Sequence, residues 1–139
     1  PKPGLISQTF TGSTASIFAA DYIVKDLMEN NFFGKDGKIV GLHQVFAQGF
    51  ENIKNRHPHW IQGPYGIGGM VAMTPFDGSL EKAKKLIQAL FEAGVIAFVA
   101  GSSPTRLRFL PPLGVVTEDD IHNVLAILES TMETLEQTF

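Results

Sequence analysis

Short apolar runs bounded by glycine or proline alternate in this chain with longer segments of helical periodicity. Apolar residues in the longer segments recur every three or four positions, which predicts amphipathic helices, whereas the short runs have the length of strands. The predicted helices cover residues 16–30, 37–57, 80–93 and 118–135, and the predicted strands cover residues 68–74, 95–100 and 106–110. This order predicts an α+β fold in which helices cover a small three-stranded, mainly antiparallel sheet.

Each predicted helix is expected to turn one apolar face inward. Asp77 or Ser79 is the expected cap of the third helix, Pro58 ends the second, and Thr117 opens the last. The side chains expected to face inward are Ile17, Ala20, Val24, Leu27 and Met28 in the first helix, Ile39, Leu42, Phe46, Phe50 and Ile53 in the second, Leu80, Ala83, Ile87, Leu90 and Phe91 in the third, and Ile121, Val124, Leu125, Leu128, Met132 and Leu135 in the last.

Composition favours one globular domain, because 139 residues with 44% hydrophobic content can bury a core. A net charge of −3 without a long basic run argues against nucleic acid as a partner. No cysteine occurs, and no apolar run has the length of a membrane span or a secretory segment, so we expect a soluble, cytoplasmic protein. The sequence starts Pro-Lys-Pro-Gly without an initiating methionine, so we expect it to be a piece of a longer protein.

Two arginines stand two residues apart in the segment RLRFLPPL. Side chains alternate along a strand, so Arg106 and Arg108 are expected to share one face while Leu107 and Phe109 pack on the other. Two prolines follow and cannot donate to a sheet, so the strand is expected to end near Leu110. The pattern leaves two interpretations open, namely solvated arginines on an outer face and a binding group at the end of a strand.

The segment TGST places Ser13 and Thr14 just before a predicted helix. Hydroxyls there either cap the helix or bind a phosphate, and both interpretations remain open. The glycine-rich segment 63–69 precedes a strand and is interpreted as a bulge or turn. His57 and His59 lack a third ligand in view, and the acids at 118–120 suit the first turn of a helix, so no metal site and no catalytic residue is assigned.

Together these motifs resemble the C-terminal part of class III pyridoxal-phosphate aminotransferases, the family of ornithine, acetylornithine and 4-aminobutyrate aminotransferases. The resemblance covers nearly the whole chain and depends on the order of four motifs. They are GST at 12–14, GPYGIGGMVAM at 63–73, EAGVIAFVA at 92–100 and LRFLPPLGVVTEDDI at 107–121. It implies that residues 15–139 form the small C-terminal domain of a fold type I aminotransferase. Residues 1–14 would then be an extended lead-in that belongs to the large domain.

The resemblance also implies roles for individual residues. Arg108 would hold the substrate carboxylate, and Ser13 and Thr14 would contact the phosphate of pyridoxal phosphate bound to the neighbouring subunit of a homodimer. The longer protein would transfer an amino group from an amino acid to a 2-oxo acid. The family's Schiff-base lysine lies upstream of the Gly-Ser-Thr element, so the isolated chain is expected to be inactive and to bind no cofactor.

Two alternatives remain open at this stage. One is a stand-alone, non-catalytic module for binding or assembly. The other is a class III enzyme of another reaction type, a decarboxylase or an aminomutase, which would share the fold and the cofactor. The sequence does not identify the amino donor or acceptor.

Overall fold

The computed structural model describes residues 12–139, which form four helices and a four-stranded sheet. The α+β class predicted from the sequence is confirmed. The elements in chain order are α1 (Thr14–Glu29), α2 (Lys38–Arg56), β1 (Ile61–Ile67), β2 (Met70–Pro75), α3 (Leu80–Glu92), β3 (Phe98–Ala100), β4 (Arg106–Phe109) and α4 (Glu118–Glu136). None of these helices combines the length and the apolar character that crossing a membrane requires.

The sheet has the strand order β1-β2-β4-β3, and every neighbouring pair is antiparallel. The prediction of three strands is wrong by one, because β1 occupies a segment interpreted as a bulge or turn. Pro64 and three glycines between residues 63 and 68 hide the alternation that marks a strand. Pro64 is tolerated because β1 is an edge strand, and the predicted irregularity does occur, as a register shift between Gln62 and Tyr65.

Gly66 shows why this strand needs glycine. Its φ is +110°, and a Cβ at this position would collide with the carbonyl oxygen of Met70 on β2. Only a residue without a side chain lets β1 and β2 approach here, so the hairpin requires a glycine that also weakens the sequence signal of the strand.

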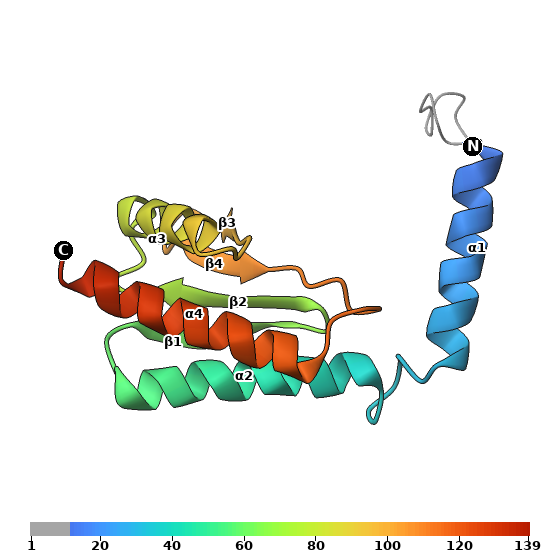
Figure 1. Ribbon diagram of the computed structural model, residues 1–139, viewed down its shortest axis with the longest axis horizontal. Helices are drawn as coiled ribbons and strands as arrows, with labels where there is room; N and C mark the ends of the chain where they lie inside the picture. Colours follow the sequence, from blue (N-terminus) through green and yellow to red (C-terminus); the bar gives the residue numbers. More distant parts are fainter. Residues whose placement is uncertain (1–11) are drawn as a thin grey trace.

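The helices α2, α3 and α4 pack on one face of the sheet (Figure 1). Most side chains predicted to face inward on α2 and α4 are buried there, and β4 adds Leu107 and Phe109, which are 0% and 4% exposed. On α3 the prediction is partly wrong, because Leu80 and Phe91 are exposed and Leu86 is buried instead. The opposite face of the sheet carries the two arginines.

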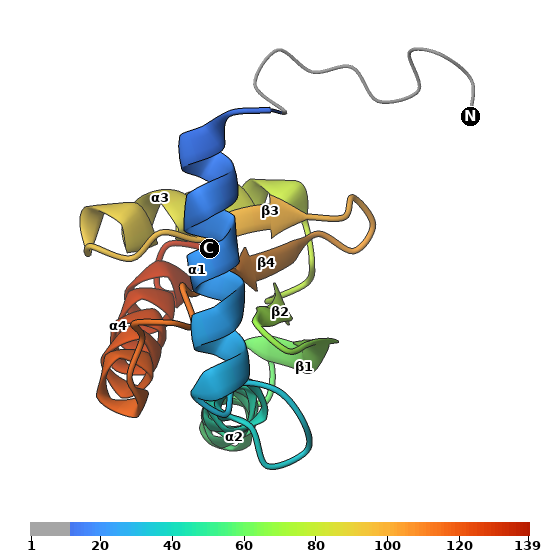
Figure 2. The same ribbon diagram turned by 90° about the vertical axis from the view of Figure 1, so that its right-hand side faces the viewer.

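Helix α1 stands away from the sheet and from the other three helices (Figure 1), although its C-terminal half lines a pocket together with the loop at 111–115. Figure 2 looks along the molecule from the side of α1. None of its residues is buried, and Ile17, Val24 and Met28 are 58%, 53% and 71% exposed. The prediction that this helix buries an apolar stripe is therefore wrong for residues 12–139. The periodicity identified a helix with an apolar side, but it carries no information on what covers that side.

The N-terminus of α4 is closed by a capping box. The backbone N–H of Asp120 donates to Thr117 Oγ1 at 3.2 Å, and the backbone N–H of Thr117 donates to Asp120 Oδ2 at 2.9 Å. The second of these bonds, together with the hydroxyl of Thr117, lowers the pKa of Asp120. The helix start predicted at Thr117 is confirmed.

Replacing this cap is expected to weaken the fold measurably. Thr117→Ala removes the side-chain acceptor of the helix N-terminus, so it should lower the free energy of unfolding by about 1 kcal/mol in urea denaturation. Thr134→Ala, an exposed position inside the same helix, is the matched control. It should leave stability unchanged or slightly raised, since alanine favours helix. Equal losses in both variants would contradict a specific capping role.

An ion pair joins α2 to α4 away from the arginine face. Glu129 accepts hydrogen bonds from Arg56 Nε and Nη2, both at 2.7 Å, and these bonds hold the pKa of Glu129 below its ordinary value of 4.5. His57 Nε2 lies 3.4 Å from the same carboxylate and its ring is stacked on Trp60 at 3.6 Å.

The lowered pKa of Glu129 predicts part of the acid sensitivity of the fold. A carboxyl whose pKa is lower in the folded chain stabilises the fold above its unfolded pKa, and this contribution disappears as pH falls through the folded pKa. Glu129→Gln should therefore reduce stability at neutral pH and flatten the decline in stability as pH falls below 4.5, measured by chemical denaturation. An unchanged slope in the variant would show that this pair does not contribute.

Candidate functional site

The arginine face of the sheet is built by one row of paired residues across all four strands. Arg108 pairs with Ala72 on β2 and with Phe98 on β3, and Ala72 in turn pairs with Tyr65 on β1. Paired residues of neighbouring strands project to the same side, so these side chains share a face with Arg106. The predicted alternation along β4 is confirmed, because Leu107 and Phe109 point into the core.

Arg108 carries a guanidinium without a counter-charge in the described chain. Its Cζ lies 6.0 Å from the centre of the Phe98 ring, and none of the ion pairs within residues 12–139 includes it. Its Nε is buried and has no hydrogen-bond partner there. A half-buried guanidinium with unused N–H donors, one residue before the end of a strand, can donate to a carboxylate in a directional, charge-assisted pair.

Arg106 is half-buried and lies over an aromatic ring. Its Cζ lies 4.2 Å from the centre of the Tyr65 ring, two strands away on β1, in a cation–π contact. No acidic side chain within the described range pairs with it. Sequence reasoning missed Tyr65, because a contact between β1 and β4 follows from strand order and not from spacing.

Ser13 and Thr14 form the start of α1. Ser13 is the N-cap in an extended conformation, with φ −62° and ψ 116°, but its side chain makes no capping hydrogen bond. Its hydroxyl and the first-turn N–H groups of the helix can therefore bind an anion. The structure does not bring Ser13 and Thr14 together with Arg108, because α1 stands away from the sheet (Figure 1).

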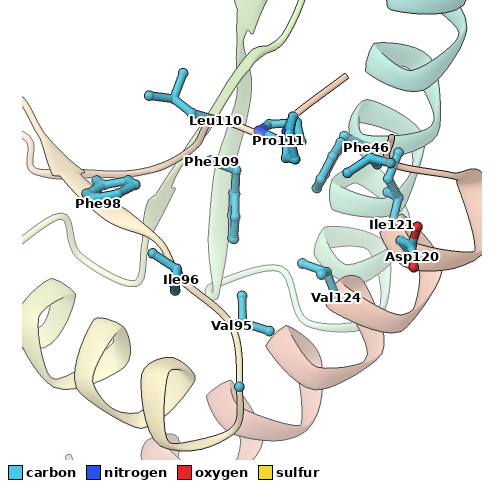
Figure 3. A pocket seen from close by; sticks show the side chains of 13 residues that line it. Phe46, Val95, Ile96, Phe98, Phe109, Leu110, Pro111, Asp120, Ile121 and Val124 are labelled. Carbon is cyan, nitrogen blue, oxygen red and sulfur yellow. The ribbon is translucent and has the colours of Figure 1, made fainter. Parts of the chain in front are cut away.

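An apolar cavity lies on the other side of β4, facing the helices (Figure 3). It has a volume of about 420 Å³ and is lined by Phe46, Val95, Phe109, Pro111 and Ile121 among others, with Asp120 beside them. The Asp120 carboxylate already serves the capping box, so the cavity holds no free polar group from that residue. Within residues 12–139 no group of three or more His, Cys, Asp or Glu side chains is placed to hold a metal ion.

No protein-family model matches the chain. It is 31% identical over 134 residues to the mitochondrial acetylornithine aminotransferase of Neurospora crassa, an alignment that covers 96% of this chain and 27% of that protein. It is 27% identical over 134 residues to a diaminobutyrate–2-oxoglutarate transaminase of Virgibacillus pantothenticus, covering 94% of this chain and 30% of that one.

Solved aminotransferases have the same fold as this chain. The lysine aminotransferase from M. tuberculosis superposes with a TM-score of 0.78 at 21% identity, over 95% of this chain and 28% of that one. The acetylornithine aminotransferase from Elizabethkingia anophelis gives 0.75 at 23% identity, over 96% and 33%. The chain belongs to the class III aminotransferase family. It corresponds to the C-terminal domain of these enzymes, as the sequence motifs predicted.

This aminotransferase domain spans about three tenths of the length of the curated relatives it matches. Within the described residues, Arg108 presents a half-buried guanidinium with no acidic partner. The guanidinium of Arg108 lies beside Phe98, Ala72 is its pairing partner on β2, and Arg106 is on the same face of the sheet. This arrangement suits the binding and orientation of an acidic ligand.

Proposed function

We propose that this domain belongs to a pyridoxal-phosphate-dependent aminotransferase that transfers an amino group from an amino acid to a 2-oxo acid, and that it holds the carboxylate of the substrate. One observation carries the assignment to this site. The chain has an aminotransferase fold, and its Arg108 guanidinium has no acidic partner within residues 12–139. Arg108 lies near the end of β4, and the side chains on the other face of that strand are buried in the core.

Arg108 would act by binding and orientation. The planar guanidinium offers parallel N–H donors that match the two oxygens of a carboxylate, so it fixes the direction of the bound acid as well as its position. Leu107 and Phe109 anchor the strand on either side of Arg108 and limit its movement. Holding the acid in one orientation lowers the entropic part of the barrier for chemistry elsewhere in the site.

Ser13 and Thr14 fit the phosphate of the cofactor. The Ser13 hydroxyl is not used as a cap, and the first turn of α1 offers backbone N–H donors to an anion. We propose that these residues contact the phosphate of pyridoxal phosphate held by a neighbouring subunit, which makes the longer protein a homodimer. When bound, the cofactor supplies the electron sink for amino-group transfer. The division into a lead-in at 1–14 and a domain at 15–139 belongs to this proposal.

A panel of amino donors tests the proposed function. Each donor is incubated with the longer protein that contains this chain, pyridoxal phosphate and 2-oxoglutarate, the acceptor in the name of the Virgibacillus pantothenticus relative. We expect at least one amino acid to yield its 2-oxo acid together with an equal amount of glutamate. A protein that loses carbon dioxide from the donor, or that releases no product from any donor, would contradict the proposal.

A further inference from the structure

We propose that Leu113 is a positioning residue for Arg108. Its side chain packs on Gly69, in the turn of the β1–β2 hairpin, and this contact fixes the chain where it leaves β4. The inference rests on the proposed function, because it concerns how the guanidinium that holds the carboxylate keeps its direction. Leu113 acts through Arg108 and not by contact with the substrate.

The sheet stops holding the chain just after Arg108. The pairing of β4 with β2 ends at Phe109 and Val71. Leu110 follows and is 50% exposed, and the next two residues are prolines, which have no backbone N–H to donate to a neighbouring strand. Side-chain packing therefore has to hold the chain beyond Phe109.

Leu113 supplies this packing by lying on the backbone of Gly69. The β1–β2 turn and the chain that follows β4 are at the same end of the sheet (Figure 1). A Cβ at position 69 would lie 2.6 Å from Leu113 Cδ1 and 3.1 Å from Leu113 Cγ, so the leucine fills the space that any larger residue would need. Gly69 does not have the positive φ of its neighbour Gly68. The need for glycine at 69 therefore comes from the close approach of Leu113 and not from the backbone conformation.

The turn on which Leu113 packs is itself held by α2. His43 Nδ1 donates to the carbonyl oxygen of Gly68 at 2.9 Å. Ile39, one helical turn earlier, lies 3.4 Å from the position that a Cβ of Gly68 would take. Helix α2 is anchored in the core by Phe50, which is fully buried. Leu113 thus rests on a turn that is tied to the core of the domain.

Phe109 and Leu113 anchor the two ends of a short, stiff segment. Phe109 is 4% exposed, and its ring lies 5.9 Å from that of Phe46, centre to centre. Both prolines between the anchors have a fixed φ, so the segment has little freedom once its two ends are held. When Leu113 is released, one anchor is lost and the last pair of β4 opens more often. Arg108 lies next to that pair, so its guanidinium then loses its fixed direction.

Gly69→Ala tests this contact with little effect on overall stability. The added methyl group displaces the half-buried Leu113, which borders a cavity of about 490 Å³ between α1 and residues 111–115 and can move into it. In NMR experiments on the 139-residue chain, the backbone order parameter of Leu110 should fall from about 0.85 toward about 0.6. The buried Arg108 Nε–H should exchange with water about tenfold faster, because opening of the strand end exposes it. The melting temperature should change by less than about 2 °C.

Gly114→Ala is the matched control, because it adds a methyl group to the same segment where nothing lies within 4 Å. It should change neither the order parameter nor the exchange rate. Leu113→Ala should reproduce the effect of Gly69→Ala, the two substitutions together should add nothing further, and Leu113→Met, which keeps a long apolar side chain, should resemble the parent. Arg106 Nε is buried as well, so general unfolding would accelerate exchange at Arg106 and Arg108 alike, whereas release of Leu113 should leave Arg106 unchanged.

The outcomes distinguish failure of this inference from failure of the proposed function. In the longer protein, Gly69→Ala should raise KM for an amino acid donor about three- to tenfold and leave a donor without a carboxylate nearly unchanged. Unchanged exchange at Arg108, or equal acceleration at Arg106, would overturn the positioning role of Leu113. Faster exchange at Arg108 with an unchanged KM would overturn it too, since Leu113 would then hold the strand without serving the substrate. A longer protein that transfers no amino group from any donor would refute the proposed function, and the exchange rates would then decide alone whether Leu113 positions Arg108.

Discussion

Arg108→Lys, made in a longer protein with the amino-transfer activity proposed above, is expected to lower kcat/KM for an amino acid donor by about 1.5 to 3 kcal/mol, roughly ten- to a hundredfold. Lysine keeps the positive charge but replaces a planar pair of donors by a single ammonium group, so the carboxylate loses its fixed orientation. The guanidinium has no competing acid within residues 12–139, and therefore no other interaction compensates for the change.

An amine donor without a carboxylate is the discriminating control for this prediction. Such a donor has no carboxylate for the Arg108 guanidinium to bind, so Arg108→Lys should leave its kcat/KM nearly unchanged. Arg106→Lys keeps the charge beside Tyr65 and should stay within about 0.5 kcal/mol of the parent for a monocarboxylic amino acid. Equal losses for both donors, or greater sensitivity at Arg106, would refute the role assigned to Arg108.

The local pattern of the sequence was sufficient to predict the arginine face. Alternation along a strand depends only on neighbouring residues, so Arg106 and Arg108 on one side and Leu107 and Phe109 on the other follow from the segment itself. The start of α4 is local in the same way, because Thr117 and Asp120 satisfy each other within one turn. Features whose interactions lie within a few residues were predictable for this reason.

The remaining features depend on partners far away in the sequence. Arg106 meets Tyr65 because β2 lies between β4 and β1, and no spacing rule predicts that strand order. β1 was not predicted because glycine weakens the pattern of a strand. Gly66 is required by the close approach of the Met70 carbonyl, and this requirement exists only in the folded hairpin. Helix α1 was recognised as a helix, but the environment of its apolar side could not be inferred from its period.

That residues 1 to about 12 are mobile or held by a neighbouring molecule stays a prediction. Residues 1–11 lie outside the part of the chain that the structure describes.

Phe50→Ala is expected to lower the free energy of unfolding of the 139-residue chain by about 3 to 5 kcal/mol. Phe50 on α2 is fully buried, and its ring lies 6.1 Å from Phe46 and 6.1 Å from Phe109, centre to centre. Truncation removes the buried ring and leaves a cavity beneath the strand that carries the arginines. Urea denaturation followed by circular dichroism measures the loss, and so large a fraction of a typical domain's stability should leave the variant partly unfolded at 37 °C.

Phe91→Ala on α3 is the matched control, and it separates the sequence pattern from the structure. The pattern predicted that Phe91 faces inward, but in the folded chain its side chain is 62% exposed. The substitution should therefore change stability by no more than about 0.5 kcal/mol. A loss at Phe91 comparable to that at Phe50 would mean that α3 packs in a different rotation, with Leu86 no longer buried. Because α3 contacts both β3 and β4, that rotation would also move Phe98 and the setting of Arg108. The pair of variants thus tests the packing on which the proposed site depends.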